Sequence, residues 1–434
     1  MKTVLSVRKF SCIATADIEL SALTILIGPQ ASGKSVLSKL THFCFESYRD
    51  MMASLYAGED FEEHKQSLVS KFKRWFPVSA WGTGDFTIRF VSGDFVFSVV
   101  RSKSRNAPSE KIRIVYAEHV QPSYDSFLRV MIESTRTEDT SPQIAARRVL
   151  DQKNKIVADF ERQLDKISGV KSITWQVFIP AGRSFFTSQY RTQSAFNRAE
   201  LLDPLLIEFG QLYAYVKDHG GPKLGRSNAE GQSKRLESPI VNKLLGGDII
   251  FGEDSSFLET GDGRTLPFSF LSSGQQELLP LLLTIEVFGV GNGTLTYIEE
   301  PEAHLFPESQ SVLLKHLVSL MKKEKSGAPQ IFITTHSPYI LSRINNLIKA
   351  GQLGVFKEGV LRKKIAGVVP EKSWILPGTI SAYAIEDGQV RDIVDEDGFV
   401  NAEYLDAVSN DISRELSKII QIELDHEYSE DANG

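Results

Sequence analysis

Residues 23–36 read Leu-Thr-Ile-Leu-Ile-Gly-Pro-Gln-Ala-Ser-Gly-Lys-Ser-Val. In this segment an apolar run ends at Gly28, a loop with two glycines follows, and a helical pattern begins at Lys34. The spacing G-x-x-x-x-G-K-S, in a strand–loop–helix context, predicts a phosphate-binding P-loop. The residues that would surround the phosphates are Gly28, Pro29, Gln30, Ala31, Ser32, Gly33, Lys34, Ser35 and Val36. A chance glycine-rich turn between a strand and a helix is the alternative.

The composition of this loop follows from the chemistry of phosphate binding. Gly28 and Gly33 let main-chain N–H groups approach a phosphate closely, and the positive end of the following helix adds to the attraction. In such a loop Lys34 would reach the β- and γ-phosphates, and the Ser35 hydroxyl would ligate Mg²⁺. The segment therefore predicts a nucleotide site with magnesium.

A second apolar run, from Leu295, ends in the adjacent carboxylates Glu299 and Glu300, followed by Pro-Glu-Ala-His. At the tip of a buried strand, one acid can face Mg²⁺ while the next acts as the base for an attacking water. We assign Glu299 to the metal, through water, and Glu300 to the water nucleophile. The alternative is an acidic turn before a helix, because carboxylates favour helix N-termini.

A third short apolar run, from Gln330, ends in Thr-Thr-His336-Ser337-Pro338. His336 could donate a hydrogen bond to the γ-phosphate or hold the attacking water. Ser337 followed by Pro338 is also a good helix start. Both interpretations can hold, because the cap would fix where His336 points.

Between these runs, small polar residues open an apolar helix. They are Ser272, Ser273, Gly274 and Gln275. N–H groups and hydroxyls at a positive helix end predict a second phosphate site on the same chain, which would serve a nucleotide bound to another molecule. Read alone, Ser-Ser-Gly is also an ordinary loop.

Together and in this order, the four motifs resemble the head of ATP-binding-cassette (ABC) ATPases. The resemblance is to the soluble, DNA-associated branch with RecF, the SMC heads and the overcoming-lysogenization-defect (OLD) nucleases. It implies ATP and Mg²⁺ as ligands, ATP hydrolysis, and a dimer in which Ser272, Ser273 and Gly274 contact ATP on the second subunit. It also implies that His336 is a switch histidine.

Two features depart from that pattern. Glu299 stands where the family most often has Asp, and no clear Q-loop glutamine is present, although Gln176 on the expected strand 173–179 is a candidate. Arg183, in Ile-Pro-Ala-Gly-Arg-Ser, could contact phosphate or pair with an acid. The long span from Ser35 to Ser272 excludes the compact arrangement of transporter ATPases.

The predicted fold class is α/β: an ABC-type P-loop head with a mixed central sheet, a flanking antiparallel β-sheet and a helical insertion. Strands are expected at 2–8, 17–20, 23–27, 86–91, 95–101, 111–116, 354–356, 382–385 and 390–394, with helices at 141–167, 194–217 and 344–349 and a mobile loop at 218–235. A single head over 1–434 would comprise an N-terminal lobe with the P-loop and antiparallel sheet (1–120), a helical insertion (121–235), a lobe with signature, acids and switch histidine (236–345), and a C-terminal β/α extension (346–434).

The composition is that of an ordinary globular protein: 434 residues, 41% hydrophobic, 24% charged, with a net charge of −6. The charge excludes a histone-like binder, and the lack of a run of about 18 apolar residues excludes a membrane-spanning helix. Cys12 and Cys44 are too few for a disulfide framework, so both are expected to be reduced thiols of a cytoplasmic protein.

The acids Asp395, Glu396 and Asp397 could suggest a Toprim nuclease, but their neighbouring glycines favour solvated turns. Nuclease activity would then belong to a partner chain. The resemblance implies two partners: a second copy of this chain, and a separately encoded effector, either a nuclease (Toprim-like) or a toxin, as in the PARIS and Septu anti-phage systems. A DNA-binding repair clamp, using basic clusters at 71–74, 101–113 and 362–364, and an ATP-gated scaffold with negligible turnover are the alternatives.

Overall fold

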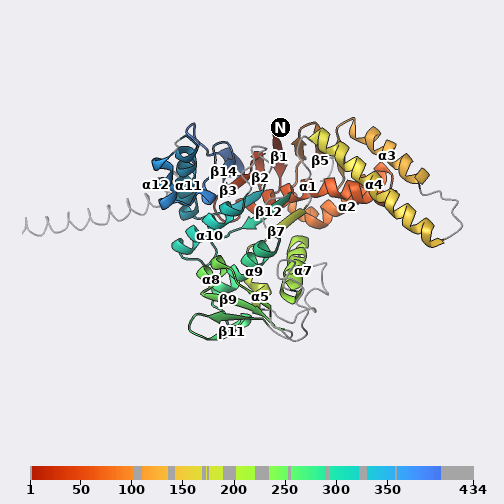
Figure 1. The fold of residues 1–434 in the computed structure, drawn as a ribbon. Coiled ribbons are helices and arrows are strands. Elements are labelled where there is room, and N and C mark those ends of the chain that lie inside the picture. The colour runs from red at the N-terminus through yellow and green to blue at the C-terminus, as the bar shows by residue number, and fades with distance from the viewer. Residues whose placement is uncertain are drawn as a thin grey trace, which may run out of the picture.

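The computed structural model describes residues 2–101, 110–134, 142–168, 173, 175–188, 202–219, 234–252, 256–288, 293–321, 330–356 and 359–401. In this part of the chain, eleven strands form one mixed sheet at the centre of the molecule (Figure 1). Their order is β6-β5-β4-β1-β2-β15-β14-β3-β13-β12-β7. The expected α/β class with a mixed central sheet is confirmed.

One half of the sheet is antiparallel. It comprises β1 (Thr3–Phe10), β2 (Ile13–Leu20), β4 (Phe86–Ser92), β5 (Phe95–Arg101) and β6 (Ile112–Tyr116). Buried and partly exposed residues alternate along β1 and β4, as in a sheet with one covered face. The expected strands at 86–116 therefore continue the central sheet through the pairing of β4 with β1.

The other half is mainly parallel and carries the motifs. It comprises β7 (Trp175–Ile179), β12 (Thr294–Glu299), β13 (Ile331–Thr335), β3 (Leu23–Ile27) and β14 (Ile380–Glu386), with β15 (Gln389–Asp392) antiparallel to β14. β3, β12 and β13 are buried at every residue, because helices cover both faces. The loops after these strands meet at one edge of the sheet, which we call the carboxyl edge.

Each face of the sheet contributes to its own apolar cluster. On one face, α1 (Lys34–Ala57) and α2 (Phe61–Trp75) place Leu37 and Phe72 in the same cluster as Leu26 and Tyr297. On the other face lie α9 (Ser273–Phe288), α10 (Pro307–Leu320) and α11 (Pro338–Phe356). α3 (Val120–Ser134) and α4 (Pro142–Ser168) extend away from the sheet as an arm (Figure 1).

A separate, four-stranded antiparallel sheet lies beyond α9 (Figure 1). It comprises β8 (Lys234–Leu236), β9 (Gly247–Phe251), β10 (Ser256–Thr260) and β11 (Thr265–Pro267). The remaining elements are α5 (Ser184–Ser188), α7 (Pro204–His219), α8 (Pro239–Leu245), α12 (Val360–Val368) and the short 3₁₀ turns Val78–Ala80, Phe268–Phe270 and Glu371–Ser373. None of the described helices is long and apolar enough to cross a membrane.

Most of the expected elements are present, with one error. The helix expected at 141–167 is α4, and the one expected at 194–217 begins at Pro204, with residues 189–201 outside the described part. The strand expected at 354–356 is wrong, because those residues end α11, which starts at Pro338 and contains the expected helix 344–349. Most of the loop expected at 218–235 also lies outside the described residues.

Candidate functional site

The expected P-loop connects β3 to α1 at the carboxyl edge. Gly33 has a φ of +104°, a conformation that L side chains rarely adopt. A Cβ there would lie 2.5 Å from Ile13 Cδ1 and 2.9 Å from Cys12 Sγ, so the turn between β1 and β2 lies directly against the loop. Both effects require glycine at this position.

Lys34, the first residue of α1, reaches back across the loop. Its Nζ donates hydrogen bonds to the carbonyls of Gly28 and Pro29, both at 2.8 Å. Burial lowers the pKa of Lys34, and the nearby carboxylates of Glu300, Glu302 and Glu299 oppose that shift. The cation is thus held between the loop and the acids of the neighbouring strands.

The two acids predicted from the second motif lie where β12 ends. Glu299 is the last residue of the strand and is buried, and its Oε2 accepts a 3.4 Å hydrogen bond from Ala181 N. Among the described residues, Glu299 Oε1 and the P-loop Ser32 Oγ are buried without a hydrogen-bond partner. A buried carboxylate oxygen without a donor is costly, so it fits a position that a divalent cation would occupy.

Glu300 follows in an unusual main-chain conformation, with a φ of +44°. Its N–H donates to the carbonyl of Thr334, near the end of β13, at 2.9 Å. Its Oε1 lies 3.6 Å from Nδ1 of His336, the residue that follows β13. The structure therefore brings together the second and third motifs, which are far apart in the sequence.

Glu302 is a site residue that the sequence analysis missed. It is buried, and its Oε1 accepts hydrogen bonds from Thr335 Oγ1 (2.6 Å) and His336 N (2.7 Å). The same oxygen lies 3.4 Å from His336 Nδ1. The third acid in Glu-Glu-Pro-Glu was a visible signal, but nothing in the sequence indicated which strand it would face.

The helix start expected at Ser337 is present. Ser337 Oγ accepts a weak hydrogen bond from Ile340 N at 3.4 Å and donates to Gln310 Oε1 at 2.6 Å. α11 thus begins at Pro338, two residues after His336, and β13 ends at Thr335, so the loop that carries the histidine is fixed on both sides.

The Ser-Ser-Gly-Gln motif opens α9, as expected. Ser272 and Ser273 are exposed, and Gln275 Oε1 accepts hydrogen bonds from Ser272 N and Ser272 Oγ, both at 3.0 Å. Gly274 is needed for a close approach, since a Cβ there would lie 2.8 Å from the carbonyl of His304. The motif is therefore accessible from outside and touches the loop that follows the acids.

The two candidates from the region of β7 have different surroundings. Gln176 lies within the strand, opposite Leu295, and its amide contacts His42 O (3.2 Å), Glu46 (3.1 Å) and Tyr297 Oη (2.9 Å). These contacts join the sheet to α1, and a role as the Q-loop glutamine stays a prediction.

Arg183 is completely buried, with Nε 3.8 Å from the carboxylate of Glu277. Of the two expected alternatives, the structure has the pairing with an acid rather than an accessible phosphate contact.

A cavity of about 380 Å³ opens beside the first turn of α1. It is lined by Phe10, Ser11, Ser35, Val36, Lys39, Arg74, Trp75, Phe76, Pro77, Ala80, Leu202, Asp203 and Pro204. Lys39 and Asp203 form an ion pair that links α1 to the start of α7. Because the cavity adjoins Ser35 and has aromatic and polar walls, it offers space for the nucleoside of a nucleotide bound at the P-loop.

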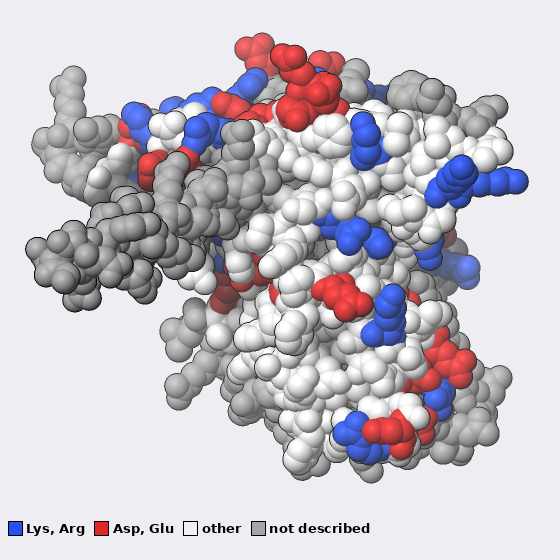
Figure 2. All heavy atoms as spheres, turned by 90° about the vertical axis from the view of Figure 1, so that its left-hand side faces the viewer, with Lys and Arg blue, Asp and Glu red and all other residues white. Residues whose placement is uncertain are grey.

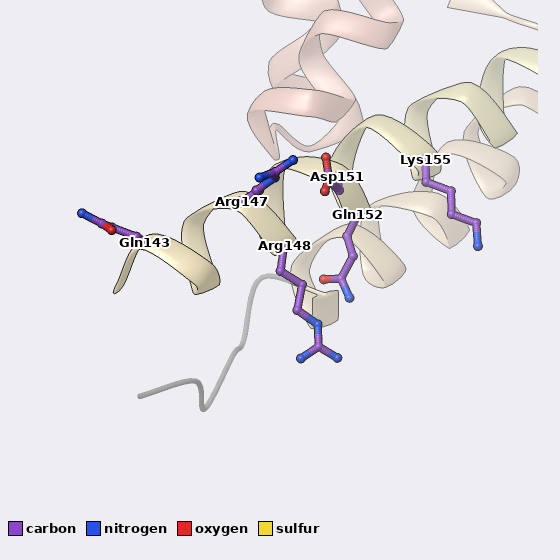
Figure 3. A pocket seen from close by; sticks show the side chains of 6 residues that line it. All are labelled: Gln143, Arg147, Arg148, Asp151, Gln152 and Lys155. Atoms are coloured by element: carbon purple, nitrogen blue, oxygen red, sulfur yellow. The ribbon is translucent and has the colours of Figure 1, made fainter. Parts of the chain in front are cut away.

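A second hollow, of about 650 Å³, lies along α4 on the projecting arm (Figure 1). Its lining residues are Gln143, Arg147, Arg148, Asp151, Gln152 and Lys155. All come from one helix, and their side chains point in different directions (Figure 3). Such an arrangement does not converge on a ligand.

The acids at 395–397 form a turn, as expected. Asp395 N donates to Phe399 O at 2.8 Å, and Asp395 Oδ1 accepts from Phe399 N at 2.7 Å. Within the described residues, no group of three or more His, Cys, Asp or Glu side chains is arranged to hold a metal ion.

Comparison with known proteins identifies one matching family. Residues 23–342 match the family described as "AAA domain, putative AbiEii toxin, Type IV TA system". Among curated proteins, none matches the sequence of this chain.

Two solved structures are among those that match this chain. The Smc head domain of Pyrococcus furiosus, bound to the C-terminal domain of ScpA, is 11% identical over 95% of this chain and 99% of that chain, with a TM-score of 0.33. The SMC head domain from Thermotoga maritima is 12% identical over 90% and 98%, with a TM-score of 0.31. At TM-scores this low, the likeness supports no argument about function. The family match spans most of the chain and includes the P-loop, both acids and His336, and the chain therefore belongs to this family of AAA-type P-loop ATPases.

Proposed function

We propose that this chain binds and hydrolyses ATP with Mg²⁺ in a site completed by a second copy of the chain, and that the resulting dimer controls a separately encoded effector. The observation that carries the proposal is the meeting of three motifs at the carboxyl edge. Lys34 lies at the P-loop, Glu299 and Glu300 follow β12, and His336 lies 3.6 Å from Glu300.

Each residue of the site has a distinct task in this proposal. Lys34 leaves its loop carbonyls to contact the β- and γ-phosphates, while Ser35 and Glu299 hold Mg²⁺, which neutralises phosphate charge when bound. Glu300 accepts the proton of the attacking water, and His336 donates a hydrogen bond toward the γ-phosphate. Glu302 holds the main chain of His336 in place through its 2.7 Å hydrogen bond.

The second copy would supply Ser272, Ser273, Gly274 and Gln275. Two large apolar side chains flank this motif and the acid-bearing loop, and both are strongly exposed: Phe270 at 77% and Phe306 at 83%. Exposed aromatic side chains around an accessible helix start are typical of a surface that another molecule covers. They support a second subunit at this surface. In the proposal, ATP joins the two subunits and hydrolysis releases them.

The biological role that we propose is that of a sensor ATPase in bacterial anti-phage defence. The family description names a putative toxin of a type IV toxin–antitoxin system, which is consistent with a defence setting. In the OLD-like systems that the motifs resemble, such as PARIS and Septu, an ATPase of this kind acts beside an effector. A nuclease or toxin partner is therefore the expected effector here.

The experiment that tests the enzymatic part compares wild type with Glu300→Gln. We expect ATP turnover in wild type, its loss in the variant, and a longer-lived ATP-bound dimer in the variant when both are sized by light scattering. Equal, negligible turnover in both proteins would instead support an ATP-gated scaffold. The control is Glu308→Gln, which makes a matched change of charge at an exposed acid on α10.

A DNA-binding repair clamp has weaker support. Lys71 is paired with Asp50 at 2.7 Å, and Arg362 with Glu371 at 2.9 Å, so two of the three basic clusters are partly neutralised. Figure 2 shows Lys and Arg in separate groups with acidic and uncharged surface between them. ATPase activity that rises with DNA and falls steeply with salt would favour the clamp over the effector partner.

A further inference from the structure

The helix that opens with the Ser-Ser-Gly motif contains a proline. Pro280 lies inside α9 and has no N–H to donate to the carbonyl of Gln276, four residues earlier. That carbonyl instead accepts a hydrogen bond from Thr187 Oγ1 on α5, at 2.9 Å. The next carbonyl, that of Glu277, accepts from Arg183 Nε at 2.9 Å. The segment 183–187 thus holds α9 at the point where the proline interrupts its hydrogen bonds.

The other end of the same guanidinium holds the acid-bearing loop. Arg183 Nη1 donates to Glu299 O at 2.8 Å and to Pro180 O at 3.0 Å, and Nη2 donates to Glu300 O at 3.2 Å. One side chain therefore connects the main chain of α9 to the main chain of both proposed catalytic acids. The planar fork of a guanidinium can make these bonds in several directions at once.

Burying the charged side chain of Arg183 has a desolvation cost that a purely space-filling role would not require. Arg183 is completely buried, and burial lowers its pKa while the carboxylate of Glu277 opposes the shift. An apolar side chain of similar volume would avoid the desolvation of a charge. The hydrogen bonds also restrain a strained residue, because Glu300 has a positive φ and needs contacts that hold it there.

We propose that Arg183 is a positioning residue that makes α9 and the loop of Glu299 and Glu300 move as one unit. When the second subunit's nucleotide contacts the start of α9, Arg183 carries the displacement to Glu300. The close approach of Gly274 to His304 links the same two segments at a second point. This inference rests on the proposed function, since it needs a nucleotide contacted in trans.

The first test measures nucleotide affinity and turnover in Arg183→Lys, Arg183→Met and Arg183→Met/Glu277→Gln. The double variant removes the buried carboxylate that a single change would leave without its partner. We expect ATP affinity within about two-fold of wild type and kcat lower by ~100-fold, the size of effect produced by a small misplacement of a reacting group. Thr187→Val, which removes the neighbouring hydrogen bond only, should lower kcat less.

Unchanged kcat in a folded Arg183 variant would overturn the proposal. So would a loss of affinity and turnover in the same proportion, because a merely structural defect would affect both. Circular dichroism and thermal unfolding identify the folded variants, and Arg183→Lys, which keeps the buried charge, provides a second chance of a folded protein.

Mixing subunits tests the coupling itself. In a mixture of Lys34→Ala and Ser273→Arg subunits, one intact composite site forms, so turnover should partly recover; failure here would contradict the proposed composite site, not Arg183. Arg183→Met is then mixed with each of these variants. In the mixture with Lys34→Ala, the working site takes its P-loop and acids from the Arg183→Met subunit, so turnover reports on that subunit's acids. In the mixture with Ser273→Arg, the working site takes its α9 motif from the Arg183→Met subunit, so turnover reports on that motif. Low turnover in both mixtures supports the coupling, and normal turnover in either mixture overturns it.

Discussion

The carboxylate of Glu302 provides the sharpest test of how the histidine loop is held. Its Oε1 accepts from Thr335 Oγ1 at 2.6 Å and from His336 N at 2.7 Å, and the residue is 5% exposed. A buried hydrogen bond to a charged group contributes about 1.5–3 kcal/mol, so Glu302→Ala should lower the free energy of unfolding by roughly 3–6 kcal/mol. Glu302→Gln keeps an acceptor oxygen and should lose about half as much.

Activity should follow the position of His336. Because Glu302→Gln loosens the main chain of the histidine, we expect kcat for ATP to fall by about 10- to 100-fold with little change in ATP affinity. Urea unfolding and steady-state hydrolysis measure the two effects, and the exposed Glu308→Ala serves as the control. An alanine variant that loses less than about 1 kcal/mol, together with a glutamine variant of wild-type kcat, would refute this account of the site.

Two further predictions use other features of the same half of the molecule. Cys12 is exposed beside Gly33 whereas Cys44 is buried, so only the Cys12 thiol should react with a maleimide. Bound nucleotide should slow that reaction, which mass spectrometry measures. An equal rate with and without ATP would contradict the placement of Cys12 beside the P-loop. Burial lowers the pKa of His42 to about 3, so the folded protein binds fewer protons than the unfolded chain, and stability is lost as pH falls below about 6.5. Between pH 6.5 and 5 the loss from this group should be about 2 kcal/mol, and His42→Phe should remove that part of the pH dependence of urea unfolding.

Much of the site was predictable because parallel strands present their carboxyl ends at one edge. The apolar runs that end at Gly28, Glu299 and Thr335 are adjacent strands, so motifs separated by hundreds of residues meet at that edge. Predicting this meeting requires no knowledge of the loops between the strands. Local spacing also predicts the helix starts at Lys34 and Pro338. These features depend on short-range patterns that a single sequence carries.

Other features depend on packing that short-range patterns do not encode. The run Gly354–Phe356 suits a strand as well as a helix, and only the continuous buried face of α11 decides between them. The roles of Glu302 and Arg183 depend on which main-chain groups lie opposite them, which is a tertiary property. The sequence also gives no order for the strands, so the position of β14 beside β3 was not foreseen.

That position has a consequence for how the protein is made. β14 pairs with the P-loop strand along its whole length, from Ile380 opposite Leu23 to Ala384 opposite Ile27, and the carbonyl of Ile385 lies 2.7 Å from where a Cβ of Gly28 would be. A ribosome must therefore synthesise about 350 residues after the phosphate loop before the strand that carries the loop gains β14 as its neighbour. Until then β3 has one open edge, and a nascent chain has no finished nucleotide cradle. The strand pairing around the phosphate loop is thus completed late in the synthesis of the chain.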